Sequence, residues 1–493
     1  MILQHMAIAA PLVAGVLLAA RCVHLLIFHP LAKVPGPKSY ALTDAFYLYY
    51  LVRGRWPAKL KTLHDEYGPT LRFGPSDVSS IAPETWKTVY AHRTQQQKTF
   101  EKDRKFFGQP YQGVDNILIA DKENHRRVRR VLAHAFSEKS LHEQEGLITS
   151  YINLFISKLA EKAAAHEPAD IVTWFNFFTF DVIGDLSFGK PFDCLANGAY
   201  SPWVTMVFEA IANDMFKQVV HRYPILKSVK SWVVPAKLAN SFATHAQLSQ
   251  KIAFERIERG NVGRKDFMDY ILRHNDDEKK GLSKVEIAVN SGSLISAGSE
   301  TTATLLSGCM FYLLTNRDKY ETLAQEIRNR YSTVDSINIH NVNELPYLSA
   351  TLKETFRMYP PVPVGLPRVA PEGGDTVAGY FIPENTSISV PHFCAYHSES
   401  NFADAETFVP ERWLGDPRYD NDKRDVLQPF STGPRDCLGK NLAYAEMRLM
   451  MVHLLWHFDL ELMPESRNWA KQRVFILWEK PALMVKLMPV QRF

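Results

Sequence analysis

The stretch "FSTGPRDCLGKNLA", residues 430–443, places a lone cysteine, Cys437, in a loop that runs straight into a helical pattern. Three uses of this cysteine compete: a buried core side chain, a nucleophile, or a metal ligand. A cysteine at a helix N-terminus has its thiolate stabilised by free N–H groups and by the positive end of the helix dipole. Arg435 adds a cation, and Gly433 and Gly439 permit unusual φ angles and backbone close to a flat ligand. These neighbours favour the metal ligand.

The overall composition indicates a large folded protein. Of the 493 residues, 46% are hydrophobic and 22% charged, which is enough for a large core and is not a disordered composition. The net charge of +4 gives no general case for nucleic-acid binding. Five cysteines without CxxC spacing argue against a disulfide framework and against a zinc site of neighbouring thiolates. We therefore expect the bulk of the chain to lie in a reducing compartment.

The N-terminus predicts a membrane anchor over residues 1–29. Residues 6–20 carry no charge, and the apolar run resumes after Arg21, so together it is long enough to span a bilayer. A cleaved signal peptide is the alternative, but no Lys or Arg precedes the apolar run. Lysines and arginines follow it, which places the body on the cytosolic side. Residues 30–40 are expected to form a stiff, proline-rich linker to a catalytic domain spanning residues 41–493.

Hydrophobic periodicity predicts a mainly α fold with a small β region. Residues 66–83 read as short strands punctuated by Gly and Pro. Residues 375–393 read as a hairpin that turns at Glu384 and Asn385. Nearly everything else has helical period, so the β region is expected to assemble from both ends of the chain.

One helix of more than 30 residues stands out. It begins at a capping-box pattern, Ser283 and Glu286, and runs to about Thr315. Its later part is apolar on most sides, which suits a helix through the middle of a large domain. The motif "AGSET", from Ala297 to Thr301, lies within it.

The "AGSET" motif has features that a plain buried helix does not need. Gly298 costs up to about 1 kcal/mol relative to Ala in a helix interior. The Thr301 hydroxyl can reach the carbonyl of Ala297 and bend the helix. A bend with a missing side chain is expected to leave a groove, and Glu300 and Thr301 would supply an acid and a hydroxyl for proton delivery.

A single thiolate with an arginine and flanking glycines fits an axial haem ligand. The stretch also matches Phe-x-x-Gly-x-Arg-x-Cys-x-Gly-x-x-x-Ala and resembles the haem-binding signature of the cytochrome P450 family of haem-thiolate monooxygenases. The resemblance covers nearly the whole chain after residue 35. It implies the family's triangular, mainly helical haem domain behind one N-terminal transmembrane helix. It also implies iron ligation by Cys437 and haem contacts from the rest of the signature, namely Phe430, Gly433, Arg435 and Gly439.

Further motifs follow in the family's order. "AGSET" resembles the oxygen-activating motif, which makes its members Ala297, Gly298, Glu300 and Thr301 candidate catalytic residues. "KETFR" and "PERW" resemble two motifs that form a buried ion triad in the family, here Glu354, Arg357 and Arg412. A buried charged triad is costly unless it is complete. Its implied role is to hold the cysteine loop in place.

The segment "ENHRRVRRVLAHAF" predicts a helix with His125, Arg129, Leu132 and Phe136 on one inward face. The family usually has Trp at the position of His125 and Arg at that of Arg129, and both bind haem propionates. By the same resemblance Arg368 and Arg435 are further propionate partners. The outward arginines, Arg126, Arg127 and Arg130, are expected to form a cationic patch with Lys440 that docks an acidic redox partner, unless they are only a solvated face.

The substrate is expected to be lipophilic. The family's variable substrate-contacting regions correspond to apolar stretches here, including residues 203–235, which are expected to touch the bilayer. Wording such as "HAFSEKSL" resembles filamentous-fungal members of secondary-metabolite pathways, such as trichothecene hydroxylases, which favours a terpenoid or polyketide. The predicted pocket residues are Phe106, Phe107, Tyr111, Val362, Val364 and Leu366.

The resemblance implies a monooxygenase that uses haem b and O2 at the endoplasmic reticulum membrane, with its catalytic domain in the cytosol. The chain has no G-x-G-x-x-G motif after a strand, so electrons are expected from a separate NADPH–cytochrome P450 reductase, or from cytochrome b5. One alternative is a reductase-independent isomerase or peroxide-rearranging enzyme, but such members tend to lose the acid–alcohol pair that is intact here. The other is a haem sensor or carrier, which would not explain the oxygen groove.

Overall fold

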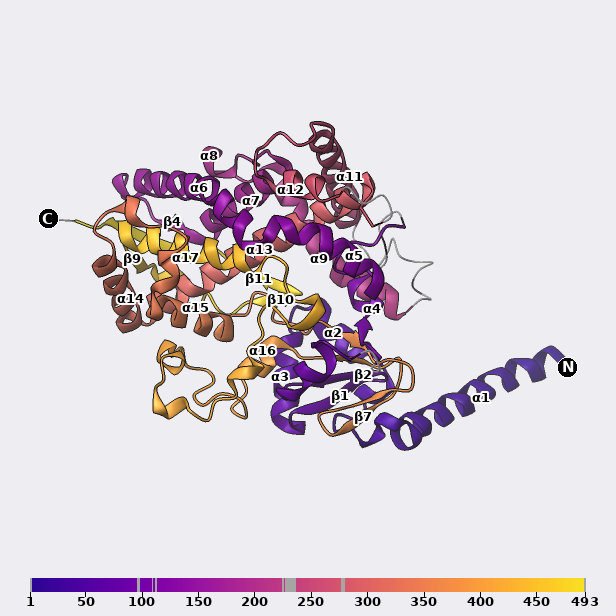
Figure 1. The fold of residues 1–493 in the computed structure, drawn as a ribbon. Coiled ribbons are helices and arrows are strands. Elements are labelled where there is room, and N and C mark those ends of the chain that lie inside the picture. The colour runs from indigo at the N-terminus through magenta and orange to yellow at the C-terminus, as the bar shows by residue number, and fades with distance from the viewer. Residues whose placement is uncertain are drawn as a thin grey trace.

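The computed structural model describes residues 2–94, 98–108, 110, 113–223, 226, 236–275 and 280–491. A large helical body and a smaller lobe built around a sheet lie against each other, and α1 projects from the smaller lobe (Figure 1). Each part packs around its own hydrophobic core. The expected mainly α fold with a small β region is confirmed.

The longer helices build the body around α13, which lies between α7, α11 and α17. The described helices are α1 (Ile2–Val23), α2 (Ala45–Val52), α3 (Trp56–Tyr67), α4 (Arg104–Phe107), α5 (Lys122–Leu132), α6 (Glu138–Ala164), α7 (Ile171–Phe188), α8 (Cys194–Asn197), α9 (Pro202–Arg222), α11 (Ala236–Glu258), α12 (Phe267–Arg273), α13 (Lys284–Thr315), α14 (Arg317–Arg330), α15 (Pro346–Met358), α16 (His392–Tyr396) and α17 (Lys440–His457).

The predicted bounds of the central helix are confirmed. The Ser283 hydroxyl accepts a hydrogen bond from the Glu286 N–H, and the Glu286 side chain accepts one from the Ser283 N–H. This reciprocal pair satisfies two donors that the start of a helix otherwise leaves unpaired. α13 ends at Thr315, and most of its side chains after Thr302 are buried.

The main sheet joins two distant parts of the chain. Its order is β1 (Thr70–Gly74), β2 (Asp77–Ser80), β8 (Ser387–Ser389), β5 (Arg368–Val369) and β3 (Glu101–Lys102), with only the β2–β8 pair parallel. Three smaller sheets pair β6 (Asp375–Val377) with β7 (Tyr380–Ile382), β10 (Arg473–Phe475) with β11 (Leu477–Glu479), and β12 (Met484–Pro489) with both β4 (Ala169–Asp170) and β9 (Phe458–Leu462).

The hairpin predicted to turn at Glu384 and Asn385 is wrong. β6 and β7 pair with each other around Ala378 and Gly379, which have φ angles of 47° and 81°. The segment after Asn385 instead enters the main sheet as β8, between β2 and β5. The local pattern of strand and turn residues allows a turn at either place. Tertiary packing decides which partner a short strand pairs with.

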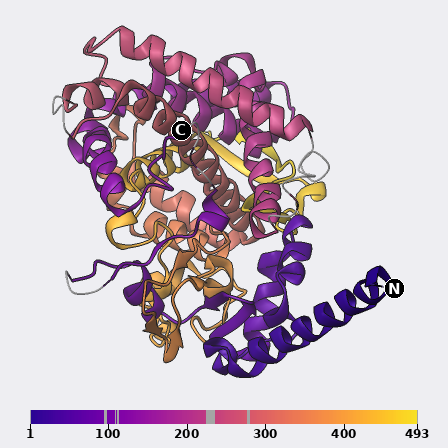
Figure 2. The same ribbon diagram turned by 90° about the vertical axis from the view of Figure 1, so that its right-hand side faces the viewer.

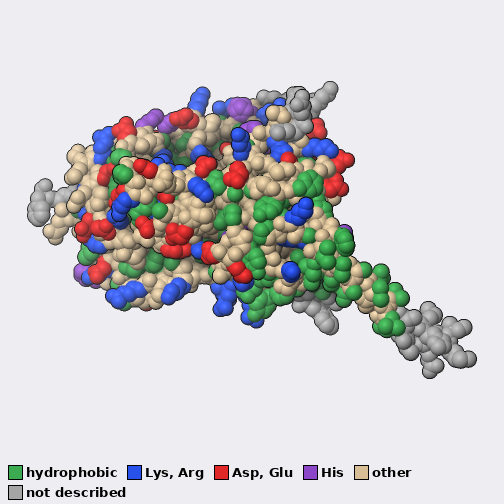
Figure 3. Space-filling model, turned by 90° about the horizontal axis from the view of Figure 1, so that it is seen from below, with side chains coloured by type: hydrophobic (Ala, Val, Ile, Leu, Met, Phe, Trp, Pro, Cys, Tyr) green, Lys and Arg blue, Asp and Glu red, His purple; other side chains and the backbone are tan. Residues whose placement is uncertain are grey.

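The N-terminal helix extends away from the rest of the protein (Figures 1 and 2). Residues Pro11–Phe28 are long and apolar enough to cross a membrane, and only 6% of them are buried. Hydrophobic side chains also gather on the smaller lobe where α1 leaves it (Figure 3). On α2, Phe46, Tyr49 and Val52 are exposed. An apolar surface of this kind suits contact with lipid.

Residues 30–40 are folded onto the smaller lobe. Leu31 is fully buried in that lobe's core, and Tyr40 is nearly so. The Arg72 guanidinium donates to the Leu25 carbonyl over 2.8 Å, which ties the end of the apolar segment to β1. The segment is therefore part of the lobe, and not only the stiff linker that its prolines indicated, because its apolar side chains have a core to enter.

Candidate active site

The cysteine loop lies just before α17. The Cys437 N–H donates to the Phe430 carbonyl over 2.8 Å and closes the loop. Gly433 has a φ of 78°, and a Cβ there would lie 2.2 Å from the carbonyl oxygen of Tyr90, so only glycine fits. Gly439 differs from our expectation: its φ is −87°, and a Cβ would make only ordinary contacts.

Cys437 combines an exposed residue surface with a desolvated thiol. The residue is exposed, yet burial raises the pKa of its thiol, and Asp436 adds to the rise. The Gly439 N–H, Arg129 and Lys440 lower the pKa without outweighing burial. The net rise differs from the stabilised free thiolate that the helix end predicted. Because a bound metal ion deprotonates a coordinating thiol outright, the site suits a metal ligand better than a free nucleophile.

The Ala297–Thr301 turn of α13 also has accessible side chains. Ala297 is exposed and Thr301 is half-buried, although the turns that follow are buried. The Thr301 hydroxyl donates to the Ala297 carbonyl over 2.6 Å, as expected. Gly298 faces elsewhere, since a Cβ there would lie 2.8 Å from Cδ1 of Ile183 on α7. The absence of a side chain at Gly298 therefore lets α7 pack closely against α13 and does not leave the expected groove.

Glu300 is buried and bound to a lysine from the C-terminal region. Its carboxylate Oε1 pairs with Lys480 Nζ, which also donates to the Thr304 hydroxyl over 2.7 Å. The other oxygen, Oε2, is buried without a hydrogen-bond partner among the described residues. Sequence analysis missed Lys480, because 180 positions separate it from Glu300 and no local pattern connects them.

A group of basic side chains converges beside the cysteine loop. Lys102 and Arg368 are directly opposite each other on β3 and β5, although like charges in such a position repel. Neither has an ion-pair partner among the described residues, and Arg368 Nε is buried without a hydrogen bond. The pKa of His125 is lowered to about 3, mainly by burial and to a smaller extent by the nearby cations. The cations that act on His125 are Arg435, Arg129, Lys102 and Arg368.

Carboxylates neutralise only part of the positive charge of these side chains. Glu101 pairs with Arg435 at 3.1 Å, and Asp436 pairs with Arg129 at 2.5 Å. Arg435 Nη1 nevertheless stays buried without a partner. Buried cations that lack counter-charges are unfavourable, so the group suits a ligand with two carboxylates, which is what haem presents through its propionates. The residues present thus fit the haem that the signature implies.

Comparison with known proteins decides the family. The sequence model of the cytochrome P450 family matches residues 40–487. The chain belongs to the cytochrome P450 family. It is 43% identical over 462 residues to cytochrome P450 monooxygenase astA of Talaromyces wortmannii, which covers 94% of this chain and 93% of that protein. It is 42% identical over 489 residues to cytochrome P450 monooxygenase lcsI of Purpureocillium lilacinum (97% and 93%), and 40% identical over 494 residues to the trichothecene C-4 hydroxylase of Trichoderma arundinaceum (97% of each).

These relatives confirm the expected monooxygenase and give no support to the isomerase. Members of the cytochrome P450 family bind haem through a thiolate and use O2. The accessible thiol of Cys437 agrees with thiolate ligation, and the unneutralised cations beside it agree with the binding of haem propionates.

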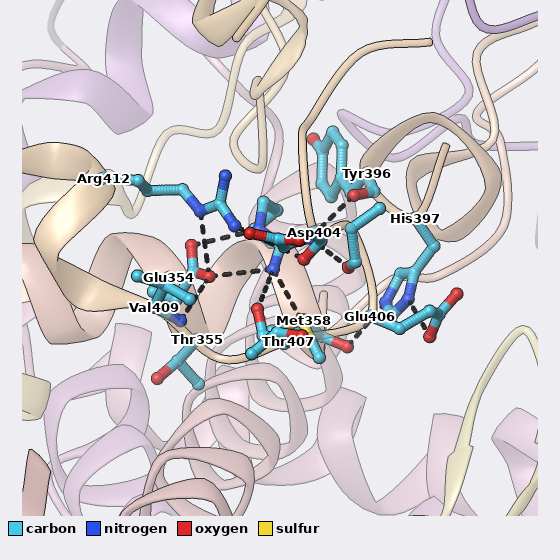
Figure 4. Close-up of polar contacts among 12 residues, drawn as sticks. Glu354, Thr355, Met358, Tyr396, His397, Asp404, Glu406, Thr407, Val409 and Arg412 are labelled. Atoms are coloured by element: carbon cyan, nitrogen blue, oxygen red, sulfur yellow. Dashed lines mark hydrogen bonds and ion pairs between the residues drawn. The ribbon is translucent and has the colours of Figure 1, made fainter. Parts of the chain in front are cut away.

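In this cytochrome P450 the predicted ion triad comes together, and Figure 4 shows Glu354 and Arg412 side by side. Arg357 Nη2 lies 2.8 Å and Arg412 Nε 3.1 Å from Oε1 of Glu354, and all three side chains are fully buried. Phe356 packs edge-on against Phe430, with 5.1 Å between ring centroids. α15, which carries the first two members of the triad, therefore touches the loop directly.

Two of the predicted pocket residues share a hollow between the smaller lobe and α9. Phe106 and Val364 line it together with Tyr47, Trp56 and Arg222. Three of these side chains are aromatic, and Tyr47 and Trp56 come from the smaller lobe's core. The buried ion pair of Arg222 with Asp77 also lines the hollow, so its lining is mixed.

The other predicted pocket residues lie outside this hollow. Val362 packs against the large core and Leu366 against the smaller one. The ring of Phe107 lies 4.0 Å from Lys102 Nζ, so it supports the basic group through a cation–π contact. Tyr111 lies outside the described residues, as does much of the segment 203–235.

The expected cationic patch loses one member in the structure. Arg126, Arg130 and Lys440 are exposed. Arg127 instead pairs with Glu286 at the start of α13. Arg127 therefore stabilises the fold and is not a free docking cation.

Glu446 on α17 provides a pH-dependent test of the core. It is buried beside Thr302, and burial raises its pKa to about 8. The folded state thus holds a proton that the unfolded state releases near pH 4.5, so this group makes stability fall as pH rises from about 4.5 to about 8. We expect Glu446→Gln to raise the free energy of unfolding by on the order of 3 kcal/mol at pH ~7.5 and by almost nothing at pH ~4. Urea denaturation at both pH values checks this, with the exposed Glu465→Gln as control.

Proposed function

We propose that this chain is a haem-thiolate monooxygenase of fungal secondary metabolism that hydroxylates a lipophilic terpenoid or polyketide. The observation that carries this proposal is the pairing of an accessible but desolvated thiol, Cys437, with adjacent buried cations that lack counter-charges. The names of the relatives, one of them a trichothecene hydroxylase, support the class of substrate.

The residues of the site have distinct tasks in this proposal. Cys437 would ligate the iron, and haem, when bound, would supply oxygen activation of the kind that a thiolate ligand favours. Arg368, Arg435, His125 and Lys102 would hold its propionates. Arg129 braces the loop through Asp436. Thr301 presents its hydroxyl at the accessible turn of α13 and there holds a proton for oxygen reduction.

Electrons come from outside the chain. An NADPH–cytochrome P450 reductase, or cytochrome b5, docks on the exposed Arg126, Arg130 and Lys440. Exposed charges of this kind raise association rates and make them dependent on salt. The patch adjoins both the cysteine loop and α5, so electron transfer over a short path is favoured.

The projecting helix anchors the protein in the endoplasmic reticulum membrane, with the body in the cytosol. The apolar, unburied segment Pro11–Phe28 supports this assignment. We expect a chain without residues 1–23 to shift largely from the membrane to the soluble fraction while it keeps its haem. Fractionation after expression measures both. Full membrane retention together with unchanged haem would contradict the anchor.

Turnover with a purified reductase tests the proposed function. Candidate metabolites are first chosen by the shift that each produces in the haem spectrum. The full chain is then supplied with NADPH, reductase and oxygen-18 gas. We expect a product that carries one labelled oxygen and that forms only with NADPH and reductase. Turnover without either would indicate the isomerase, and tight metabolite binding without any turnover would indicate the sensor or carrier.

A further inference from the structure

A buried ion pair joins the oxygen-activating helix to the C-terminal sheet. The Glu300 and Lys480 side chains are 5% and 3% exposed, so neither charge is compensated by water. Among the described residues Lys480 is the one cation paired with Glu300. Lys480 therefore sets where the Glu300 carboxylate lies.

The backbone around Lys480 is held firmly. Trp478, two residues earlier on β11, stacks on Tyr359 with 4.5 Å between ring centroids. Its indole N–H donates to the Pro360 carbonyl over 2.8 Å. Nζ of Lys480 also donates to the Thr304 hydroxyl, one turn after Glu300 on α13. The lysine is thus preorganised by packing and does not reach Glu300 as a mobile surface side chain.

The same hairpin borders the hollow lined by Phe106 and Val364. Ile476, at the turn between β10 and β11, has a φ of 71° and lines that hollow. A β-branched residue in the left-handed region is strained and persists only where its surroundings impose it. A short rigid segment therefore connects a wall of the hollow to the partner of Glu300.

We propose that Lys480 is a positioning residue for proton supply, which holds Oε1 of Glu300 in place so that its other oxygen, Oε2, can pass protons toward Thr301. Hydroxylation consumes one O2, two electrons from the reductase and two protons, and yields the alcohol and one water. Glu300 passes protons on through Oε2, which has no other hydrogen-bond partner among the described residues. This inference rests on the proposed monooxygenase function.

The test compares two ways of driving the reaction in Lys480→Met. With NADPH and reductase, which require proton delivery to reduced oxygen, we expect product formation to fall about tenfold and hydrogen peroxide release to rise. With added hydrogen peroxide, which brings its own protons, we expect turnover within about twofold of wild type. Lys480→Arg should restore most of the NADPH-driven rate, and the exposed Lys471→Met is the matched control. An equal fall by both routes, or no fall by either, overturns the inference.

A second measurement does not depend on activity. We expect Glu300→Gln to destabilise the protein less when Lys480 is already Met, which urea denaturation of the four members of this double-mutant cycle shows. Additive effects would mean that the pair does not interact, and the inference would fail. Lys480→Met alone could fold poorly because it leaves one buried charge. In that case the double variant, which removes both charges, is expected to fold, and its NADPH-driven reaction should still release hydrogen peroxide in place of product. Absence of NADPH-driven product from wild type would instead overturn the proposed function.

Discussion

Replacing Cys437 with serine is expected to abolish the thiolate-type carbon monoxide spectrum of the reduced protein. Serine keeps the size and the loop hydrogen bond to Phe430, which uses the backbone N–H. It cannot supply the soft thiolate that gives this spectrum. NADPH-driven turnover should fall below detection as well. The measurement is a difference spectrum of the dithionite-reduced protein with and without carbon monoxide.

Cys22 offers a matched control for this substitution. It lies in α1, at the base of the projecting segment, and Cys22→Ser should leave the spectrum unchanged. If Cys437→Ser kept the thiolate spectrum, another cysteine would have to be the ligand. Cys194, Cys309 and Cys394 are all buried in the cores, whereas Cys437 is exposed, so none of the three is placed to take over.

Replacing Glu354 with alanine is expected to yield protein with little haem. The carboxylate receives hydrogen bonds from Arg357, Arg412, Trp413 and the Val409 N–H, and none of the charged side chains reaches water. Its removal leaves two buried guanidinium groups without their shared partner, which costs about 3–5 kcal/mol. Haem content per protein and the urea midpoint measure the effect.

An exposed pair on the preceding helix controls for the loss of a glutamate. Arg317 and Glu321 on α14 form an (i, i+4) pair whose side chains are 53% and 56% exposed. Glu321→Ala should change stability by less than about 0.5 kcal/mol, since water replaces the lost contact. Equal haem loss in both variants would mean that the triad has no special role, and normal haem content in Glu354→Ala would be incompatible with its position behind the loop.

Much of the site was readable from short stretches, because local rules act over a few residues. The capping box at Ser283 and the hydrogen bond from Thr301 to Ala297 both join residues within one helical turn. The cysteine loop is closed by a bond between two residues seven positions apart, Phe430 and Cys437. Spacing alone predicted the first two of these contacts.

Other features escaped because they depend on which distant segments meet. Gly298 was expected to leave a groove, but it admits Ile183 of α7. Arg127 was expected on the surface, yet Glu286 of α13 binds it. Asp422 forms a second ion pair with Arg412, with 2.5 Å between Oδ2 and Nη1. No sequence pattern predicted this pair. In each case the residue type was read correctly, and its partner lay on an element whose position the pattern did not specify.

By itself, the sequence determined the family, the ligand cysteine as a prediction, the central helix with both its ends, and the apolar N-terminal segment. Only the tertiary structure decided that Lys480 pairs with Glu300, that Lys102 joins the arginines near Cys437, and that residues 30–40 pack into the smaller lobe. The reason is physical. Helix caps and loop closures are settled by bonds between near neighbours, whereas buried charges find their partners only when the whole chain has excluded water around them.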